Sequence, residues 1–273
     1  MKNKLIKLIT LVWLLPLSGV FAASFDHSHA AYTELLQKHV IVYDDGRRSV
    51  VDYAALKADE PALNAYLQEL TDVTDAQYDA WTRDQQLAFL INAYNAFTLE
   101  LIIDNYASFA SGENESIRDL GSLFYSAWER DFVDLLGEMR TLDWIEHETI
   151  RVDFDEPRIH AVLVCAAMSC PKLRDEAYTA ATLDAQLEDQ MRTFLSDRSK
   201  NGIDEHGLYL SRIFDWYEED FGDLRTYMRR YADALAEDQA ERDALIDDIR
   251  IRYTDYDWRL NNPANAKLRN NAR

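Results

Sequence analysis

The stretch TRDQQLAFLINAYNAFTLELIIDNY, residues 82–106, decides the fold of this chain. Thr82 and Gln85 stand three residues apart at its start, which fits a capping box and predicts that a helix begins there. Apolar residues recur along the stretch at helical spacing, and further apolar side chains lie outside that stripe. A helix that is apolar on more than one face is buried, so we expect this segment to be the central helix of the domain.

Two asparagines, Asn92 and Asn95, interrupt the apolar part of this helix. They are three residues apart and therefore lie on neighbouring parts of one face. A buried Asn must find hydrogen-bond partners. Each is expected to be either a structural clamp or part of a polar, substrate-binding site.

The segments on either side of this helix predict an α+β fold. Helical spacing or helix-start signals occur at residues 31–40, 61–70, 143–151, 183–195, 214–231 and 238–247. Hairpins are predicted at residues 132–141 and 202–210, and single strands at residues 157–165 and 250–256. No internal repeat or linker divides the sequence. We expect a single, helix-rich domain with a small central sheet over residues 25–262, followed by a flexible tail over residues 263–273.

The N-terminus has the three parts of a secretory signal peptide. Three Lys within the first seven residues form a positive start, an apolar run follows over residues 8–17, and small residues lead to Ala22. The apolar run is too short for a comfortable transmembrane span. We therefore expect a signal peptide over residues 1–22 and an exported, soluble mature protein, periplasmic or secreted, with no stable membrane insertion.

The charge of the chain narrows the classes of partner. Its 273 residues include 29 Lys and Arg against 49 Asp and Glu, which gives a formal net charge of −20. Such an acidic protein repels phosphate backbones, so nucleic-acid binding is excluded as a general function. Anionic membrane surfaces are disfavoured for the same reason. A small molecule or a peptide is the expected ligand.

The two cysteines, Cys165 and Cys170, allow two interpretations. In an oxidising compartment the simpler one is a disulfide. The other makes one of them a nucleophile, which acts as the thiolate. The pattern H-x4-C-x4-C that His160 forms with them lacks the short spacings of common zinc sites, so no metal is expected. The sequence also has no phosphate-binding Gly loop, no GxSxG and no HExxH, and no cofactor is predicted.

A catalytic set can be assembled around these cysteines. Cys170 or Cys165 would be the nucleophile and His160 the base, and Glu146 or Asp257 would orient the base. His160 could equally be a buried, hydrogen-bonded core histidine. Substrate-binding candidates are His147, Asn92 and Asn95. The acidic residues at 218–219 are interpreted as a solvated face.

Five ordered motifs resemble the family known as domain of unknown function 547. They are AFLINAYNAFTLELI, LDWIEHETIR, PRIHAVLVCAAMSCPKLR, LSRIFDWYEEDFG and YTDYDWRLN, and they span residues 27–262. The hallmark segment is complete here as His160, Cys165, Ser169, Cys170 and Pro171. The resemblance implies an exported bacterial domain and supplies no established reaction.

The order of a central helix, a His-bearing strand and an Asp-bearing strand is also similar to papain-like and transglutaminase-like folds, with His160 and Asp257 at two positions of the triad. Three hypotheses follow. The first is a thiol-dependent hydrolase or acyl transferase acting on peptide or amide bonds. The second is a non-catalytic periplasmic ligand-binding module, in which a Cys165–Cys170 disulfide pins a pocket near His160 and Asn95. The third is a redox protein that cycles the two sulfurs.

Overall fold

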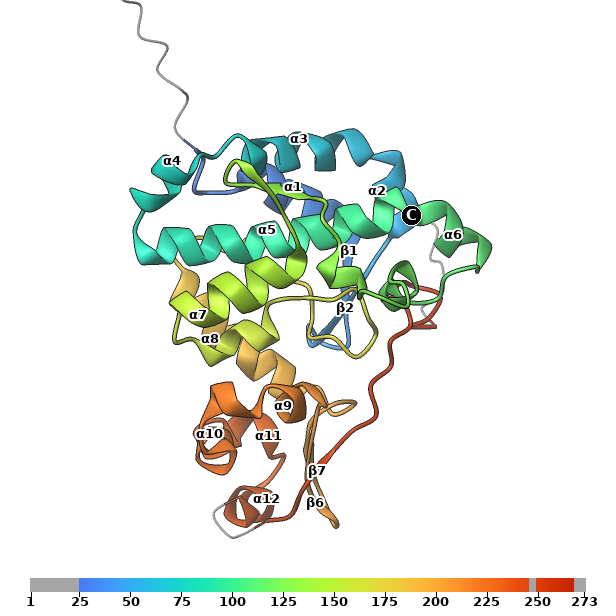
Figure 1. The fold of residues 1–273 in the computed structure, drawn as a ribbon. Coiled ribbons are helices and arrows are strands. Elements are labelled where there is room, and N and C mark those ends of the chain that lie inside the picture. The colour runs from blue at the N-terminus through green and yellow to red at the C-terminus, as the bar shows by residue number, and fades with distance from the viewer. Residues whose placement is uncertain (1–24, 246–248, 268–273) are drawn as a thin grey trace, which may run out of the picture.

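The long helix α5 (Arg83–Asp104) runs through the middle of the protein, and the other elements pack around it (Figure 1). The computed structural model describes residues 25–245 and 249–267. The elements before α5 and directly after it are α1 (Ala30–His39), β1 (Val40–Tyr43), β2 (Arg48–Val51), α2 (Tyr53–Ala58), α3 (Glu60–Thr71), α4 (Asp75–Asp79) and α6 (Tyr106–Ser111). Figure 1 shows α1 to α4 on one side of α5 and α7 to α12 on the other, with α6 at the end of α5.

Helix α5 forms the core, as its sequence predicts. Thr82 and Gln85 make the capping box at its start. All positions from Leu87 to Ile103 are buried except Glu100, so the helix is covered on all sides. It is long and apolar enough to cross a membrane, but 89% of its most apolar window is buried inside the protein. Its hydrophobicity is therefore accounted for by packing.

The middle of the chain is built from short elements. They are η1 (Ile117–Leu120), η2 (Ala127–Glu129), β3 (Val133–Leu135), β4 (Glu138–Arg140), the π-helical segment η3 (Trp144–Ile150), α7 (Arg151–Asp153) and the 3-10 helix η4 (Pro157–Ala161). The hairpin expected at residues 132–141 is confirmed, because β3 pairs with β4 in antiparallel register. Leu136 and Gly137 form its turn with positive φ angles of 55° and 77°.

The C-terminal part forms a second, smaller core against α8 (Leu183–Ser196). Its other elements are β5 (Gly202–Asp204), β6 (Gly207–Leu210), α9 (Ile213–Trp216), η5 (Glu218–Phe221), α10 (Leu224–Arg230), α11 (Ala232–Leu235), α12 (Gln239–Ala244) and β7 (Ile251–Tyr253). The β5–β6 hairpin is confirmed, and β7 adds to β6 in parallel. Residues 214–231 were expected to be helical with a break at Gly222, and they form α9, η5 and α10, with Gly222 at a φ of 63° directly after η5.

The strand expected at residues 157–165 is wrong, since the segment forms η4 and a series of turns. The Asn95 side chain donates to Val162 O at 2.9 Å and accepts from Val164 N at 2.9 Å. Gln190 of α8 donates to Ala161 O at 3.1 Å. Side chains of the flanking helices thus satisfy backbone groups that a neighbouring strand would otherwise pair.

The prediction of a single helix-rich α+β domain is confirmed. The small central sheet is divided, however: the described strands form two sheets of two strands and one of three. The predicted signal peptide at residues 1–22 lies outside the described residues, as does the tail beyond residue 267.

Candidate functional site

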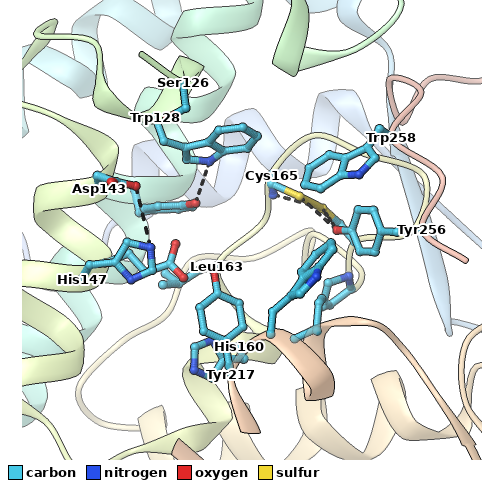
Figure 2. A pocket seen from close by; sticks show the side chains of 16 residues that line it. Ser126, Trp128, Asp143, His147, His160, Leu163, Cys165, Tyr217, Tyr256 and Trp258 are labelled. Atoms are coloured by element: carbon cyan, nitrogen blue, oxygen red, sulfur yellow. Dashed lines mark hydrogen bonds and ion pairs between the residues drawn. A yellow bond between two sulfur atoms is a disulfide. The ribbon is translucent and has the colours of Figure 1, made fainter. Parts of the chain in front are cut away.

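A cavity of about 280 Å³ opens where the middle of the chain meets α9 and the C-terminal segment (Figure 2). Six of its lining residues are aromatic, and they are Tyr94, Trp128, Trp216, Tyr217, Tyr256 and Trp258. The other lining residues are Ser126, Asp143, Glu146, His147, His160, Leu163, Cys165, Cys170, Pro171 and Ile213. The cavity therefore combines apolar walls with a few polar groups, as ligand sites in proteins do.

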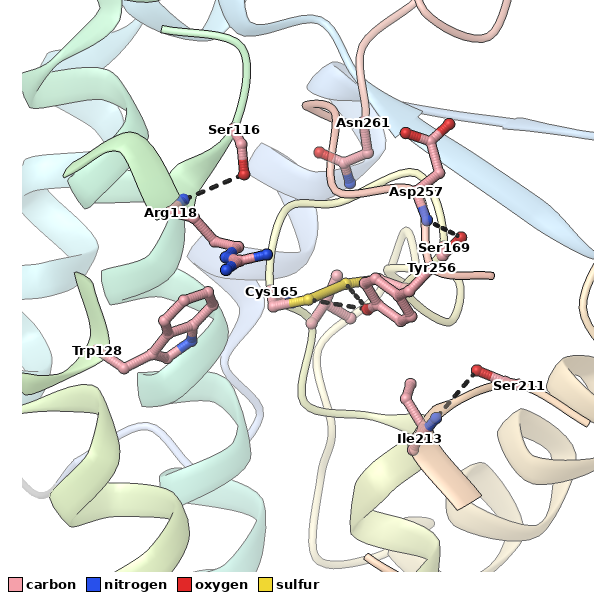
Figure 3. Close-up of a disulfide and its surroundings, with 12 residues drawn as sticks. Ser116, Arg118, Trp128, Cys165, Ser169, Ser211, Ile213, Tyr256, Asp257 and Asn261 are labelled. Carbon is pink, nitrogen blue, oxygen red and sulfur yellow. Dashed lines mark hydrogen bonds between the residues drawn. A yellow bond between two sulfur atoms is a disulfide. The ribbon is translucent and has the colours of Figure 1, made fainter. Parts of the chain in front are cut away.

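The two cysteines form a disulfide on one wall of this cavity (Figure 3). The Tyr256 hydroxyl lies 3.2 Å from each sulfur, and Cys165 N donates to the Cys170 sulfur at 3.1 Å. Both cysteines of the chain are bonded, so no free thiol remains. A sulfur in this state cannot act as the thiolate that a nucleophilic mechanism requires.

The opposite wall holds His160 in a fixed orientation. The residue is only 4% exposed, and its ring stacks on that of Tyr217 with the centroids 4.0 Å apart. Nε2 lies 2.6 Å from the Asp220 carboxylate. Burial lowers the pKa of His160, although Asp220 acts in the opposite direction. A neutral imidazole donates from Nε2 to Asp220, which leaves Nδ1 as the unprotonated nitrogen.

Asp220 is itself held by Arg151. The guanidinium donates to both carboxylate oxygens, at 2.7 and 2.8 Å, and its third nitrogen lies 3.1 Å from Nδ1 of His147. Burial alone would raise the pKa of Asp220, but the hydrogen bonds from Arg151 and His160 keep it below its usual value. The result is a chain of polar contacts from His147 through Arg151 and Asp220 to His160. Such a chain fixes side chains by bidentate, charge-assisted bonds.

Glu146 is buried in the same wall, at 7% exposure. Burial, followed by the charge of Glu146, raises the pKa of the Tyr94 and Tyr217 hydroxyls. Tyr94 also accepts a hydrogen bond from the Trp128 indole at 3.1 Å. Both tyrosines are therefore kept neutral, as hydroxyl groups beside a carboxylate.

The aromatic wall of the cavity is formed by Tyr256 and Trp258 of the C-terminal segment, which lies beside the disulfide loop. Tyr256 and Trp258 pack with their centroids 4.5 Å apart, and Trp216 stacks on Trp258 at 5.7 Å and 23°. The segment is positioned by backbone hydrogen bonds from Met168 N and Ser169 N, at 2.9 and 3.1 Å, to the loop over residues 257–259. The disulfide loop and the aromatic wall are thus joined through the backbone.

Residues 78–195 match the family described as Protein of unknown function, DUF547. Over this segment the chain resembles the DUF547 family. No curated protein and no solved structure matches the chain. The DUF547 segment contains α5, the disulfide and His160, and it ends before Asp220 and the aromatic wall at residues 256–258. The match confirms the resemblance within residues 78–195 and assigns no activity.

The structure brings together five of the residues that the sequence singles out. His160, Glu146, His147, Cys165 and Cys170 all line the cavity. The two proposed nucleophiles are bonded to each other in the disulfide. His160 pairs with Asp220 and with neither Glu146 nor Asp257, the two carboxylates that were expected to orient it.

Three other expected residues lie elsewhere. Asp257 pairs with Arg259 at 2.6 Å and does not line the cavity, so Asp220 takes the place that the sequence suggested for it. Asn92 and Asn95 also lie outside the aromatic cavity, and both bond to backbone groups. They are structural clamps, which is one of the two roles that the sequence left open.

Sequence reasoning missed Asp220, Arg151 and the aromatic wall. Asp220 follows directly after two acidic residues in DWYEEDFG, where a run of charge indicates a solvated face. Trp and Tyr cluster in two charged motifs, DWYEEDFG and YTDYDWRLN. This clustering could have indicated the aromatic wall and, within the first motif, Asp220. Within residues 25–245 and 249–267, no group of three or more His, Cys, Asp or Glu side chains could hold a metal ion.

Proposed function

We propose that the protein is an exported, non-catalytic binding module that takes a small-molecule or peptide ligand in the aromatic cavity. The observation that carries the proposal is that Glu146 and His160, both more than nine-tenths buried, line a cavity whose walls include six aromatic residues. Asp220 holds His160, and the Tyr94 and Tyr217 hydroxyls lie beside Glu146, so both polar groups are fixed at the cavity, where a ligand can meet them. The volume of about 280 Å³ suits a small ligand or one side chain of a larger one.

The disulfide supports a binding role over a catalytic one. It closes a short loop and holds Tyr256 through both sulfurs, so it helps to fix one wall of the cavity. A preformed wall reduces the conformational entropy that is lost when a ligand binds. On the chain-entropy account, a loop of this size also stabilises the fold by about 2 kcal/mol.

A thiol-dependent hydrolase or acyl transferase is the second candidate. One observation favours it: Cys165, Cys170 and His160 line the same cavity. The mechanism would need the sulfurs reduced, with one as nucleophile and His160 as base. Asp220 would then orient His160. A redox protein would use the same two sulfurs without the base.

Counting thiols separates these functions. The full mature chain is purified without reductant, denatured, and titrated with a thiol reagent. We expect no free thiol, as a binding module with a permanent disulfide requires. Two free thiols would favour the enzyme. If none is found, the reduction potential of the pair distinguishes a structural disulfide, below about −300 mV, from a redox-active one.

Replacing both sulfurs gives a second test. The variant with Cys165→Ser and Cys170→Ser should lose about 2 kcal/mol of unfolding free energy, measured with denaturant. Binding of a probe to the cavity should persist once the variant is folded. The enzyme hypothesis predicts instead that hydrolysis of a peptide or amide substrate by the wild type disappears in this variant. The reduced wild-type protein is the matched control.

Export is part of the same proposal. The positive start, the short apolar run and Ala22 support a leader peptide of residues 1–22. Expression of the full chain in a Gram-negative host should give a soluble periplasmic or extracellular product that begins at Ala23 or Ser24. Intact mass measures this directly, and retention of residues 1–22 in a membrane pellet would contradict it.

A further inference from the structure

The charged groups around the cavity are unbalanced. Glu146 and Asp143 both line it, whereas no Lys or Arg does among the residues that the structure describes. Arg151 lies behind the wall, where Asp220 and Glu219 bind its guanidinium. The two lining histidines have other partners: His160 bonds to Asp220, and His147 contacts Arg151 and lies 3.7 Å from Asp143 (Figure 2). Within the described residues Asp143 thus has a histidine beside it, and Glu146 is the lining carboxylate that no ion pair balances.

Glu146 is the clearest sign of this imbalance. It is 7% exposed, and within the described residues no Lys, Arg or His nitrogen forms an ion pair with it. Its neighbours in the wall are the hydroxyls of Tyr94 and Tyr217. A buried carboxylate without a positive partner is costly to the fold, and a cation supplied by a ligand would offset that cost.

The aromatic walls provide the second half of a cation site. Trp216, Tyr256 and Trp258 form a continuous cluster, and Trp128 meets Trp258 from another side with the centroids 5.9 Å apart. The faces of Trp and Tyr rings attract cations within about 6 Å, and Trp does so most strongly. A cation already uses this property outside the cavity, because the exposed Arg118 lies over the Trp258 ring at 5.1 Å.

From these observations we infer that the cavity binds a small organic cation, of the quaternary ammonium or protonated amine class. Glu146 is the counter-ion, and the rings of Trp128, Trp216 and Trp258 are the faces that surround the cation. The net charge of −20 also raises the local concentration of cations near the protein. This inference rests on the proposed binding function and names the ligand class for the same cavity.

Choline and 3,3-dimethylbutan-1-ol test the inference on the full mature protein. The two probes have nearly the same shape, but only choline carries a positive charge. Binding is measured by calorimetry and by the fluorescence of the cavity tryptophans. We expect choline to bind at least tenfold more tightly than its neutral analogue, and tetramethylammonium to compete with it. 3,3-Dimethylbutanoate, which has the opposite charge, should not bind.

Glu146→Gln removes the proposed counter-ion with little change of shape. Choline binding should weaken at least tenfold, while binding of the neutral alcohol changes less than threefold. Glu148→Gln is the matched control, because this glutamate lies two residues away and is exposed. It should leave both probes unchanged. Trp258→Leu should weaken the cationic probes by removing a ring face.

The outcomes separate this inference from the proposed function. Equal affinities for choline and the neutral alcohol would overturn the cation class and leave a binding cavity in place. If no cationic, neutral or anionic probe binds, and a panel of sugars and peptides also fails, the proposed binding function is wrong. The comparison of probes on the wild-type protein needs no variant, so it decides the question even if Glu146→Gln does not fold.

Discussion

Two groups of buried polar side chains differ in where their hydrogen bonds go. On α5, Asn92 and Asn95 each donate to one backbone carbonyl and accept from one backbone amide, at 2.7 to 2.9 Å. In the cavity wall, Glu146 and His160 are as well buried but face a space that the protein does not fill. Burial alone therefore does not mark a functional residue. The difference lies in what supplies the partners. The backbone supplies them for the two asparagines, whereas Asp220 holds His160 and the Tyr94 and Tyr217 hydroxyls lie beside Glu146 at the edge of a cavity.

The asparagine clamps are part of the folding of the chain. Each amide of an Asn side chain has the same donor and acceptor as a peptide group, so it can pair with a backbone segment as a neighbouring strand would. Asn95 holds the segment that follows η4, and Asn92 holds Tyr178. Between them they connect α5 to the loops on either side of the disulfide. The cavity is thus positioned by residues that do not line it.

Asn95→Leu is expected to have the largest effect, because it would orphan two buried backbone groups. Val162 O and Val164 N would both lose their partner. At about 1–3 kcal/mol for each orphaned group, we expect a loss of about 3 kcal/mol in the unfolding free energy. Denaturant unfolding measures it. Asn105→Ala is the control, because the Asn105 side chain donates to Leu101 O of the same helix and orphans no backbone group of a distant segment; it should cost less than about 1 kcal/mol. An unchanged midpoint for Asn95→Leu would mean that the clamp does not hold the loop.

Asp220→Asn tests the wall of the cavity and should have an intermediate effect. The substitution weakens the bidentate pair with Arg151 and removes the negative charge beside His160. We expect a loss of about 2 kcal/mol, since the pair is partly buried. Because Asp220 raises the pKa of His160, its loss should lower that pKa further. Titration of the imidazole by NMR measures this shift, which a purely structural role would not require.

Glu219→Gln is the matched control, since Glu219 is 81% exposed and also contacts Arg151. Its effect on the unfolding free energy should stay below about 0.5 kcal/mol.

Local patterns predicted the parts of the fold that depend on local forces. The capping box and apolar spacing of α5 lie within one helix, and the β3–β4 and β5–β6 hairpins join neighbouring residues. The segment over 157–165 is different. Its apolar, β-branched composition indicates a strand, but its backbone is satisfied by Asn95 and Gln190, which are distant in sequence. No local pattern shows which side chain will reach a backbone group from another helix.

The site was predicted only in part for the same reason. His160, Glu146 and the two sulfurs were found because their residue types carry chemistry. Asp220 lies 60 residues after His160 and within a run of acidic residues, so its role depends on how η5 packs against η4. Tyr256 and Trp258 reach the cavity only because the C-terminal segment returns to the loop beside the disulfide. A pairing of this kind is set by the tertiary fold.

Glu100→Gln should have the smallest effect. Glu100 belongs neither to the asparagine clamps nor to the cavity wall, so this substitution tests the comparison on a third kind of site. Glu100 is the one position between Leu87 and Ile103 of α5 that is not fully buried, and it does not line the aromatic cavity. One of its carboxylate oxygens is enclosed with no hydrogen-bond partner among the residues that the structure describes. Burial, with a smaller contribution from Asp104, raises the pKa of Glu100 to about 7.

The sign of the Glu100 effect follows from this raised pKa. The folded state binds the proton more tightly than the unfolded chain, so the stabilisation is complete below a pH of about 4.5 and is lost as the pH rises through 7. Glu100→Gln should therefore raise the unfolding free energy by about 1 kcal/mol at pH 8, after allowance for partial exposure, and change it little at pH 4. Denaturant unfolding at the two pH values measures the difference, and the exposed Glu34→Gln is the control. A loss of stability at pH 8 would mean that Glu100 has a partner like those of Asn92 and Asn95. The contrast between the partnered asparagines and the Glu100 oxygen would then fail on α5, the helix that carries all three residues.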